Sequence, residues 1–235
     1  MTLLDYRGYV RLLAILFSLF WIVLAIHPWY RQDWLLENIL LVPVIVILAW
    51  GYRKRLFSRI SYTPIFIFLC LHETGAHYTY EKVPYDAWWQ SLTGSTFNEM
   101  MGWHRNHFDR LVHFLYGLLI AYPVREIFLR VARVRGFWAY FFPLEFTMAT
   151  SAFFELVEWV AAVIVGQELG QAYLGTQGDI WDAQQDMALA SLGALIAMFI
   201  TAWVNRGYQR DFAQEWSRSL RVSSTRKKGA AKQVL

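Results

Sequence analysis

GTQGDIWDAQQDMALASLGALIAMFITAWVNR, from Gly175 to Arg206, joins three carboxylates to a long apolar run. The 19 residues between Asp186 and Arg206 contain no Asp, Glu, Lys or Arg. About 20 mostly apolar residues cross the hydrocarbon core of a membrane as a helix. The run therefore predicts a transmembrane helix whose first turns carry Asp179, Asp182 and Asp186. Because a charge facing lipid is costly, these acids predict a polar environment at that end of the helix.

The composition of the whole chain is that of a membrane protein. Of its 235 residues, 57% are hydrophobic and 18% aromatic, and the mean hydropathy is +0.29. The single cysteine, Cys70, excludes an internal disulfide framework and a thiolate metal cage. The net charge of +4 lies mainly in short basic clusters and in the tail, and we find no motif for RNA or phosphate loops, so we expect no nucleic-acid partner.

Five further segments are long and apolar enough to predict helices. The first lies between Arg11 and Arg31 and lacks a small-x-small cleavage site, so we expect it to be retained in the protein. The others run from about 35 to 52, 60 to 80, 109 to 129 and 137 to 166. The sequence thus predicts an all-α fold: a six-helix transmembrane bundle over residues 1–206, followed by a basic tail over residues 207–235.

Lysine and arginine alternate from loop to loop along these six segments. They are frequent before the first segment, in the second and fourth loops, and in the tail, which has eight from Arg206 onward; the fifth loop has none. Because basic loops stay on the cytoplasmic side, we expect both termini of this multi-pass membrane protein to be cytoplasmic. The aromatic-rich loop at about 81–108 is then external, and its Trp88, Trp89 and Trp103 fit an interfacial belt or a lid.

Four of the predicted helices bring acids and histidines to the same outer third of the bilayer. The third ends in LHETGAHYTY (71–80), the fourth begins with RNHFDRLVHF (105–114), and the fifth carries FFELVEW (153–159) near its outer end. On the fourth, fifth and sixth helices these side chains share one face, which continues in small residues such as Gly193. On the third helix, a bend at Thr74-Gly75-Ala76 decides whether His72 and His77 converge. The resulting pool of candidate site residues is His72, His77, Asp109, His113, Glu155, Glu158, Asp182 and Asp186.

Imidazoles and carboxylates together are ligands for a divalent metal ion such as Zn, Mn or Mg. The candidate metal ligands are His72, His77, His113, Asp182, Asp186 and Glu155. The candidate catalytic residues are Asp109, His113, Glu155 and Glu158, and the sequence does not separate ligands from a general base. Structural alternatives stay open: a helix cap for Asp179, a hydrogen bond for the Asp109–His113 pair, and salt bridges from Arg105 or Arg110 to the two glutamates.

Four segments together resemble the YjdF-like bacterial inner-membrane proteins, a family of unknown function: HETGAHYTY, RNHFDRLVHF, FFELVEW and GTQGDIWDAQQDM. This resemblance implies a multi-pass protein of the bacterial inner (plasma) membrane. More distantly, the chain is similar to the VanZ family, which is linked to resistance against lipid-tailed glycopeptides. That family has Asp-Lys-x-x-His, Glu-x-x-Gln and Asp-x-x-x-Asn on successive helices. The corresponding residues are Asp109, Arg110 and His113, then Glu155 and Glu158, then Asp182 and Asp186. With Arg for Lys, Glu for Gln and Asp for Asn, this site is more acidic, which favours a bound cation.

The leading hypothesis is a membrane-embedded metal-dependent hydrolase or transferase acting on a lipid or lipid-linked envelope substrate. A non-catalytic lipid- or glycopeptide-binding protein, or a structural partner in a complex, is an alternative in which the polar cluster is a satisfied hydrogen-bond network. An ion- or proton-coupled transporter is a third. It would need polar groups through the full depth of the membrane, whereas the inner half of these helices is nearly bare.

Overall fold

The computed structural model describes residues 5–165 and 176–216. In these residues there is no strand, and six helices have 20 residues or more, one for each predicted segment. They are α1 (Tyr6–Ala25), α2 (Arg31–Lys54), α3 (Arg59–Tyr78), α6 (Phe108–Ile127), α7 (Trp138–Val165) and α9 (Asp182–Gly207). The prediction of an all-α fold is therefore confirmed over the described chain.

Five of these helices are long and apolar enough to cross a membrane: α1, α2, α6 with the π-helical turn η1 (Phe128–Ala132), α7 and α9. The 20-residue α3 is not among them. It is as long as α1, but Arg59, Glu73 and two histidines lower its mean hydropathy. Its most polar side chain, Glu73, is fully buried inside the protein. The polarity of α3 is thus turned toward the neighbouring helices.

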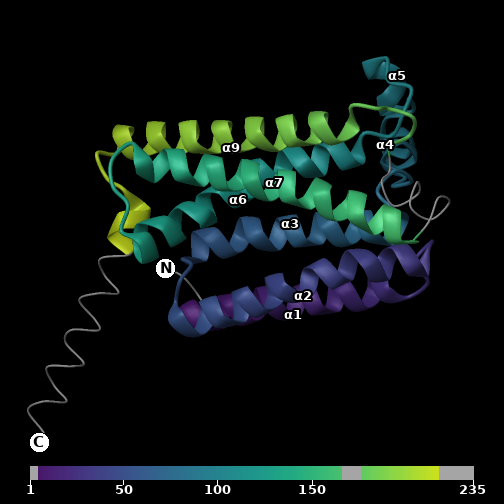
Figure 1. Ribbon diagram of the computed structural model, residues 1–235. Helices are drawn as coiled ribbons and strands as arrows, with labels where there is room; N and C mark the ends of the chain where they lie inside the picture. The colour runs from purple at the N-terminus through teal and green to yellow at the C-terminus, as the bar shows by residue number, and fades with distance from the viewer. Residues whose placement is uncertain (1–4, 166–175, 217–235) are drawn as a thin grey trace, which may run out of the picture.

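Helix α6 is at the centre of the bundle. It packs against α9, α3 and α7, and α1 and α2 join the bundle through α3, so that α9 and the α1–α2 pair lie on opposite sides (Figure 1). At the α6–α9 contact, a Cβ added to Gly117 would collide with the backbone of Ala190, and one added to Gly193 would collide with the backbone of Phe114. The small residues therefore allow the two helices to approach closely, as their positions predicted.

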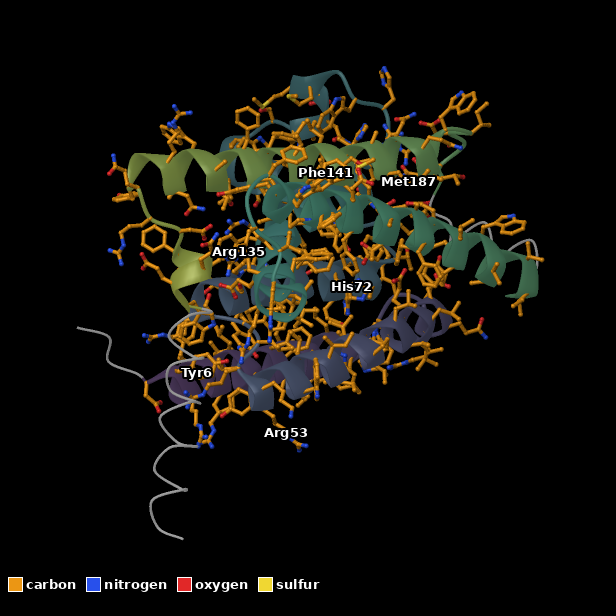
Figure 2. All side chains as sticks on the ribbon, turned by 60° about the vertical axis from the view of Figure 1, so that its left-hand side comes forward. Tyr6, Arg53, His72, Arg135, Phe141 and Met187 are labelled. Carbon is orange, nitrogen blue, oxygen red and sulfur yellow. The ribbon has the colours of Figure 1, made fainter. Side chains whose placement is uncertain are left out.

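The two ends of the bundle differ. One end carries α4 (Tyr85–Thr93) and α5 (Phe97–Met101), and we call it the α4–α5 end (Figure 1). At the other end the first and last described segments meet, since the ring centroids of Tyr6 and Trp216 are 5.7 Å apart. Tyr6, Arg53 and Arg135 lie toward this end (Figure 2). We call it the basic end, because the loops after α2 and after α6 bring their arginines and lysine there.

The aromatic-rich segment predicted at 81–108 contains α4 and α5. Its rings pack against one another, with Trp89 5.4 Å from Phe97 and Phe97 5.6 Å from Trp103. Its external position and the division into a membrane domain and a tail remain predictions. Most of the predicted tail, residues 217–235, and residues 166–175 of the fifth loop lie outside the described residues.

Two helices begin at positions other than those expected. Helix α2 begins at Arg31 rather than near Leu35, so it includes two buried acids, Asp33 and Glu37. Helix α9 begins at Asp182, which places Asp186 one turn inside the helix rather than two. In both cases acids occupy the first turns, where the partial positive charge of a helix N-terminus favours them. The sequence pattern therefore placed the start of α2 about one turn too late and the start of α9 about one turn too early.

Candidate functional site

A cavity of about 200 Å³ lies between α2, α3, α6 and α7, toward the α4–α5 end. Its polar lining includes Asp33, Glu37, His72, Thr79, Tyr80, Asp109, His113, Ser151 and Glu158. Its apolar lining includes Leu40, Leu41, Val44, Phe68 and Leu69. The cavity therefore has one side suited to a polar group and another suited to a hydrocarbon chain.

Next to this cavity, α6 and α9 bring three possible metal ligands together. One ligand atom each from Asp109, His113 and Asp186 lies within 4.8 Å of the other two. Atoms bound to one Zn ion at about 2.0–2.2 Å lie roughly 3–4 Å apart, so a small contraction would allow all three to share an ion. The spacing of Asp109 and His113 on one face of α6 contributes two ligands, and the close approach at Gly117 and Gly193 adds the third.

Glu155 of α7 extends this group. His113 Nε2 is 3.7 Å from Asp109 Oδ1 and 3.7 Å from Glu155 Oε1, and the His113 ring packs edge-on against Phe154. Within the described part of the chain, Glu155 Oε1 and Asp186 Oδ1 are buried without a hydrogen-bond partner. Carboxylate oxygens without a donor at this burial need a proton or a cation.

Arg105 and Arg110 neutralise the two other acids at the start of α9. Arg105 Nη2 is 2.9 Å from Asp182 Oδ1, while Arg110 Nη2 is 2.5 Å from Asp179 Oδ2 and 3.3 Å from Asp182 Oδ1. The backbone N–H of Trp181 donates to Asp179 Oδ1, and this bond together with Arg110 holds the pKa of Asp179 below its usual value. Asp182, a predicted metal ligand, thus lies in an ion-pair network beside the Asp186 group. The arginines contact these acids rather than the glutamates of α7.

The two predicted histidines of α3 separate. Because α3 continues unbroken to Tyr78, the separation of five positions between His72 and His77 turns them about 140° apart around the helix. His72 lines the cavity in the interior of the bundle (Figure 2), with its Nδ1 2.5 Å from the Tyr80 hydroxyl. His77 Nδ1 instead donates to the carbonyl oxygen of Leu24, 2.7 Å away. His77 therefore lies outside the group formed by the other candidates.

Four buried acids were not selected from the sequence: Asp33, Glu37, Glu73 and Glu126, which are 3%, 4%, 0% and 2% exposed. Asp33 and Glu37 line the cavity from α2. Their signal was present, since two acids one turn apart at the end of an apolar helix is the pattern that selected Asp182 and Asp186. The expected helix start near Leu35 hid it by assigning Asp33 to a loop.

Comparison with known proteins agrees with this architecture. The model of the family described as "Predicted membrane protein (DUF2238)" matches residues 9–207. The inner membrane protein YjdF of Escherichia coli (strain K12) is 36% identical over 190 residues, which cover 80% of this chain and 87% of that protein. No solved structure matches the chain.

Together with the five apolar helices, these relatives confirm the predicted location, a multi-pass protein of the bacterial inner membrane. The more distant VanZ resemblance stays a prediction. The chain belongs to the DUF2238 family of predicted membrane proteins, as its YjdF-like segments indicated.

Proposed function

We propose that all six long helices cross the membrane, with both ends of the described chain in the cytoplasm. Helix α3 has 20 residues and extends roughly 30 Å, the thickness of the hydrocarbon core. The contact between Tyr6 and Trp216 supports an even number of crossings between them. The Lys and Arg side chains at that end support a cytoplasmic position, so the α4–α5 end is external.

Reporter fusions test this topology. A reporter fused after Arg206 gives a cytoplasmic signal, and one inserted at Gly94, an exposed turn between α4 and α5, gives an external signal. An external signal from the Arg206 fusion would place the polar cavity on the cytoplasmic side and remove the envelope substrate.

On this topology the protein is a membrane-embedded metal-dependent enzyme, a hydrolase or transferase acting on a lipid or lipid-linked envelope substrate. The observation that carries this proposal is the meeting of Asp109, His113 and Asp186 within 4.8 Å beside the cavity. Glu155 is placed to act as a further ligand, and Glu158, which lines the cavity, is the candidate general base. Zn, Mn or Mg would fit a donor set of one imidazole and several carboxylates.

The charge balance supports a bound cation. Asp109, Glu155 and Asp186 are close acids, and the neighbouring arginines are bound to Asp179 and Asp182. Like charges buried together cannot all remain ionised without a compensating charge. A divalent ion would supply that charge and would activate a water molecule or polarise a phosphate or carbonyl oxygen.

The size of the cavity limits what it holds. Pockets for drug-sized ligands measure about 300–1,000 Å³, so a cavity of about 200 Å³ admits a headgroup-sized portion of a substrate rather than a whole lipid. The chains of such a substrate would then lie in the bilayer or against the apolar wall.

Elemental analysis of the full-length protein in detergent tests the metal centre. The wild type is expected to carry on the order of one divalent ion per protein, as one cluster of this spacing predicts. His113→Ala should lose the ion, whereas His77→Ala, on the histidine bound to Leu24, should keep it. Absence of metal from the wild type, or equal metal in both variants, would contradict the proposal and favour the non-catalytic binding protein.

A further inference from the structure

The α2 wall of the cavity carries a pair of acids that the proposed metal centre does not use. Asp33 and Glu37 are one turn apart, and both line the cavity. Among the described residues, neither oxygen of Asp33 has a hydrogen-bond partner, and neither does Oε2 of Glu37. Asp33 lies in the first turn of α2 but accepts no hydrogen bond from the helix N–H groups, so capping does not account for it.

The hydroxyl of Thr79 is an independent polar group at the same wall. Thr79 is 6% exposed, lines the cavity, and its Oγ1 has no hydrogen-bond partner within the described chain. It ends α3 in the left-handed conformation, with φ 57° and ψ 46°, which is uncommon for a β-branched residue. Strained conformations of this kind persist where the surroundings impose them, and they are frequent at ligand sites.

Within the described residues, no Lys or Arg forms an ion pair with Asp33 or Glu37. The described residues that line the cavity include no Lys or Arg. Lys82, whose charge acts on Asp33, is held by Glu81, 3.4 Å from its Nζ, and lies 4.4 Å from the centre of the Tyr30 ring. Over the described chain, the group spaced to share one metal ion does not contain Asp33 or Glu37. A cation from outside the protein would offset the charge of this pair.

We infer that Asp33, Glu37 and Thr79 bind the primary ammonium group of an amine-headed amphiphile. An ammonium has three N–H donors, and two carboxylates with a hydroxyl oxygen offer the acceptors. Leu40, Leu41 and Val44 follow Glu37 at helical spacing and continue the same cavity wall, where they would contact the amphiphile's chain. The inference rests on the proposed function in one respect: it makes that amphiphile the enzyme's substrate class.

A lipid series tests the inference on the unaltered full-length protein. Phosphatidylethanolamine, its N-methyl and N,N-dimethyl forms and phosphatidylcholine share a charged nitrogen, but the number of N–H donors falls from three to none. With equal acyl chains, binding measured by native mass spectrometry in detergent should weaken along the series. The total loss should be about tenfold or more, the size of one charge-assisted hydrogen bond. Equal binding of all four lipids would overturn the inference.

Variants then locate the site. The double variant Asp33→Asn with Glu37→Gln should lose the discrimination between the first and last lipids, and Glu99→Gln, an exposed acid on α5, should keep it. Discrimination kept by the double variant would overturn the inference, and so would loss of bound metal from it, since the acids would then be metal ligands. His113→Ala should lose metal but retain the discrimination. Discrimination in a wild type without metal would support the ammonium site while the proposed enzyme fails.

Discussion

The two ends of the bundle differ in how completely their buried charged groups are paired. At the basic end, the fully buried Arg125 donates to both carboxylate oxygens of Asp211, at 3.0 and 2.5 Å, and lies 4.3 Å from the centre of the Tyr140 ring. Its neighbour Glu126 accepts hydrogen bonds from the backbone N–H and the hydroxyl of Ser58, at 2.7 and 2.6 Å. Both of these buried charged groups therefore have partners that offset the cost of burial.

At the α4–α5 end the matching is incomplete. Asp179 and Asp182 pair with two arginines, but one turn further along α9 the buried Asp186 Oδ1 has no hydrogen-bond partner within the described residues. On α2, both carboxylate oxygens of Asp33 and Oε2 of Glu37 likewise have no hydrogen-bond partner within the described residues. The difference teaches that acids of one sequence stripe can have different surroundings: Asp179 and Asp182 are held in ion pairs, whereas Asp186 Oδ1 lacks a hydrogen-bond partner within the described residues.

The largest expected effect is on the matched pair at the basic end. Arg125→Met leaves the partly buried Asp211 without its partner and should lower the free energy of unfolding by about 3 kcal/mol. Thermal unfolding in detergent measures it, with the exposed Arg135→Met as control. Bound metal per folded protein should not change. An unaltered stability would mean that matching at this end does not stabilise the fold.

The next-largest effect is expected at the contact between α6 and α9 around Gly117. Gly117→Ala forces α6 and α9 apart at Ala190, so we expect a loss on the order of 1–3 kcal/mol and a weaker metal site, because Asp186 moves away from His113. Gly207→Ala, where an added Cβ meets nothing within 4 Å, is the matched control. If Gly117→Ala changes stability and metal content no more than Gly207→Ala does, the close approach of the two helices does not position the site.

Asp182→Asn and Asp186→Asn compare a matched and an unmatched acid on one helix. Asp182→Asn weakens the pairs with Arg105 and Arg110 and should cost about 1–2 kcal/mol while metal is kept. Asp186→Asn removes a carboxylate whose Oδ1 has no hydrogen-bond partner within the described residues, so the stability of the metal-free protein should change by less than about 1 kcal/mol, while the variant no longer binds metal. The reverse pattern of stability and metal content would exchange the roles of the two residues.

The smallest effect concerns the pH dependence of stability at Asp179. Its pKa is lowered by the hydrogen bond from the Trp181 N–H and by Arg110. A lowered pKa contributes stability that is complete above the ordinary value of 3.8 and is lost as pH falls through the value in the folded protein. The wild type should therefore lose thermal stability more steeply below about pH 4 than Asp179→Asn. Parallel curves for the two proteins would show that Asp179 does not contribute.

Much of the fold and part of the site follow from the sequence. Charge-free runs such as the one after Asp186 predict helices because hydropathy and length are local properties. The depth of Asp109, His113 and Glu155 also follows, because position along a helix sets the height of a side chain. Small residues on α6 and α9 correctly indicated the face along which these helices meet.

The pairing of charges could not be predicted in this way. Arg110 reaches Asp179 across 69 positions of the chain, and Arg125 reaches Asp211 across 86. His77 belongs to the predicted pool by type and depth, but the rotation of α3 turns it toward Leu24 of α1. Whether a buried acid has a partner depends on distances between helices, which hydropathy and spacing along one helix do not contain. Only the packing of α6 against α9, α3 and α7 separates the paired acids from the unpaired ones.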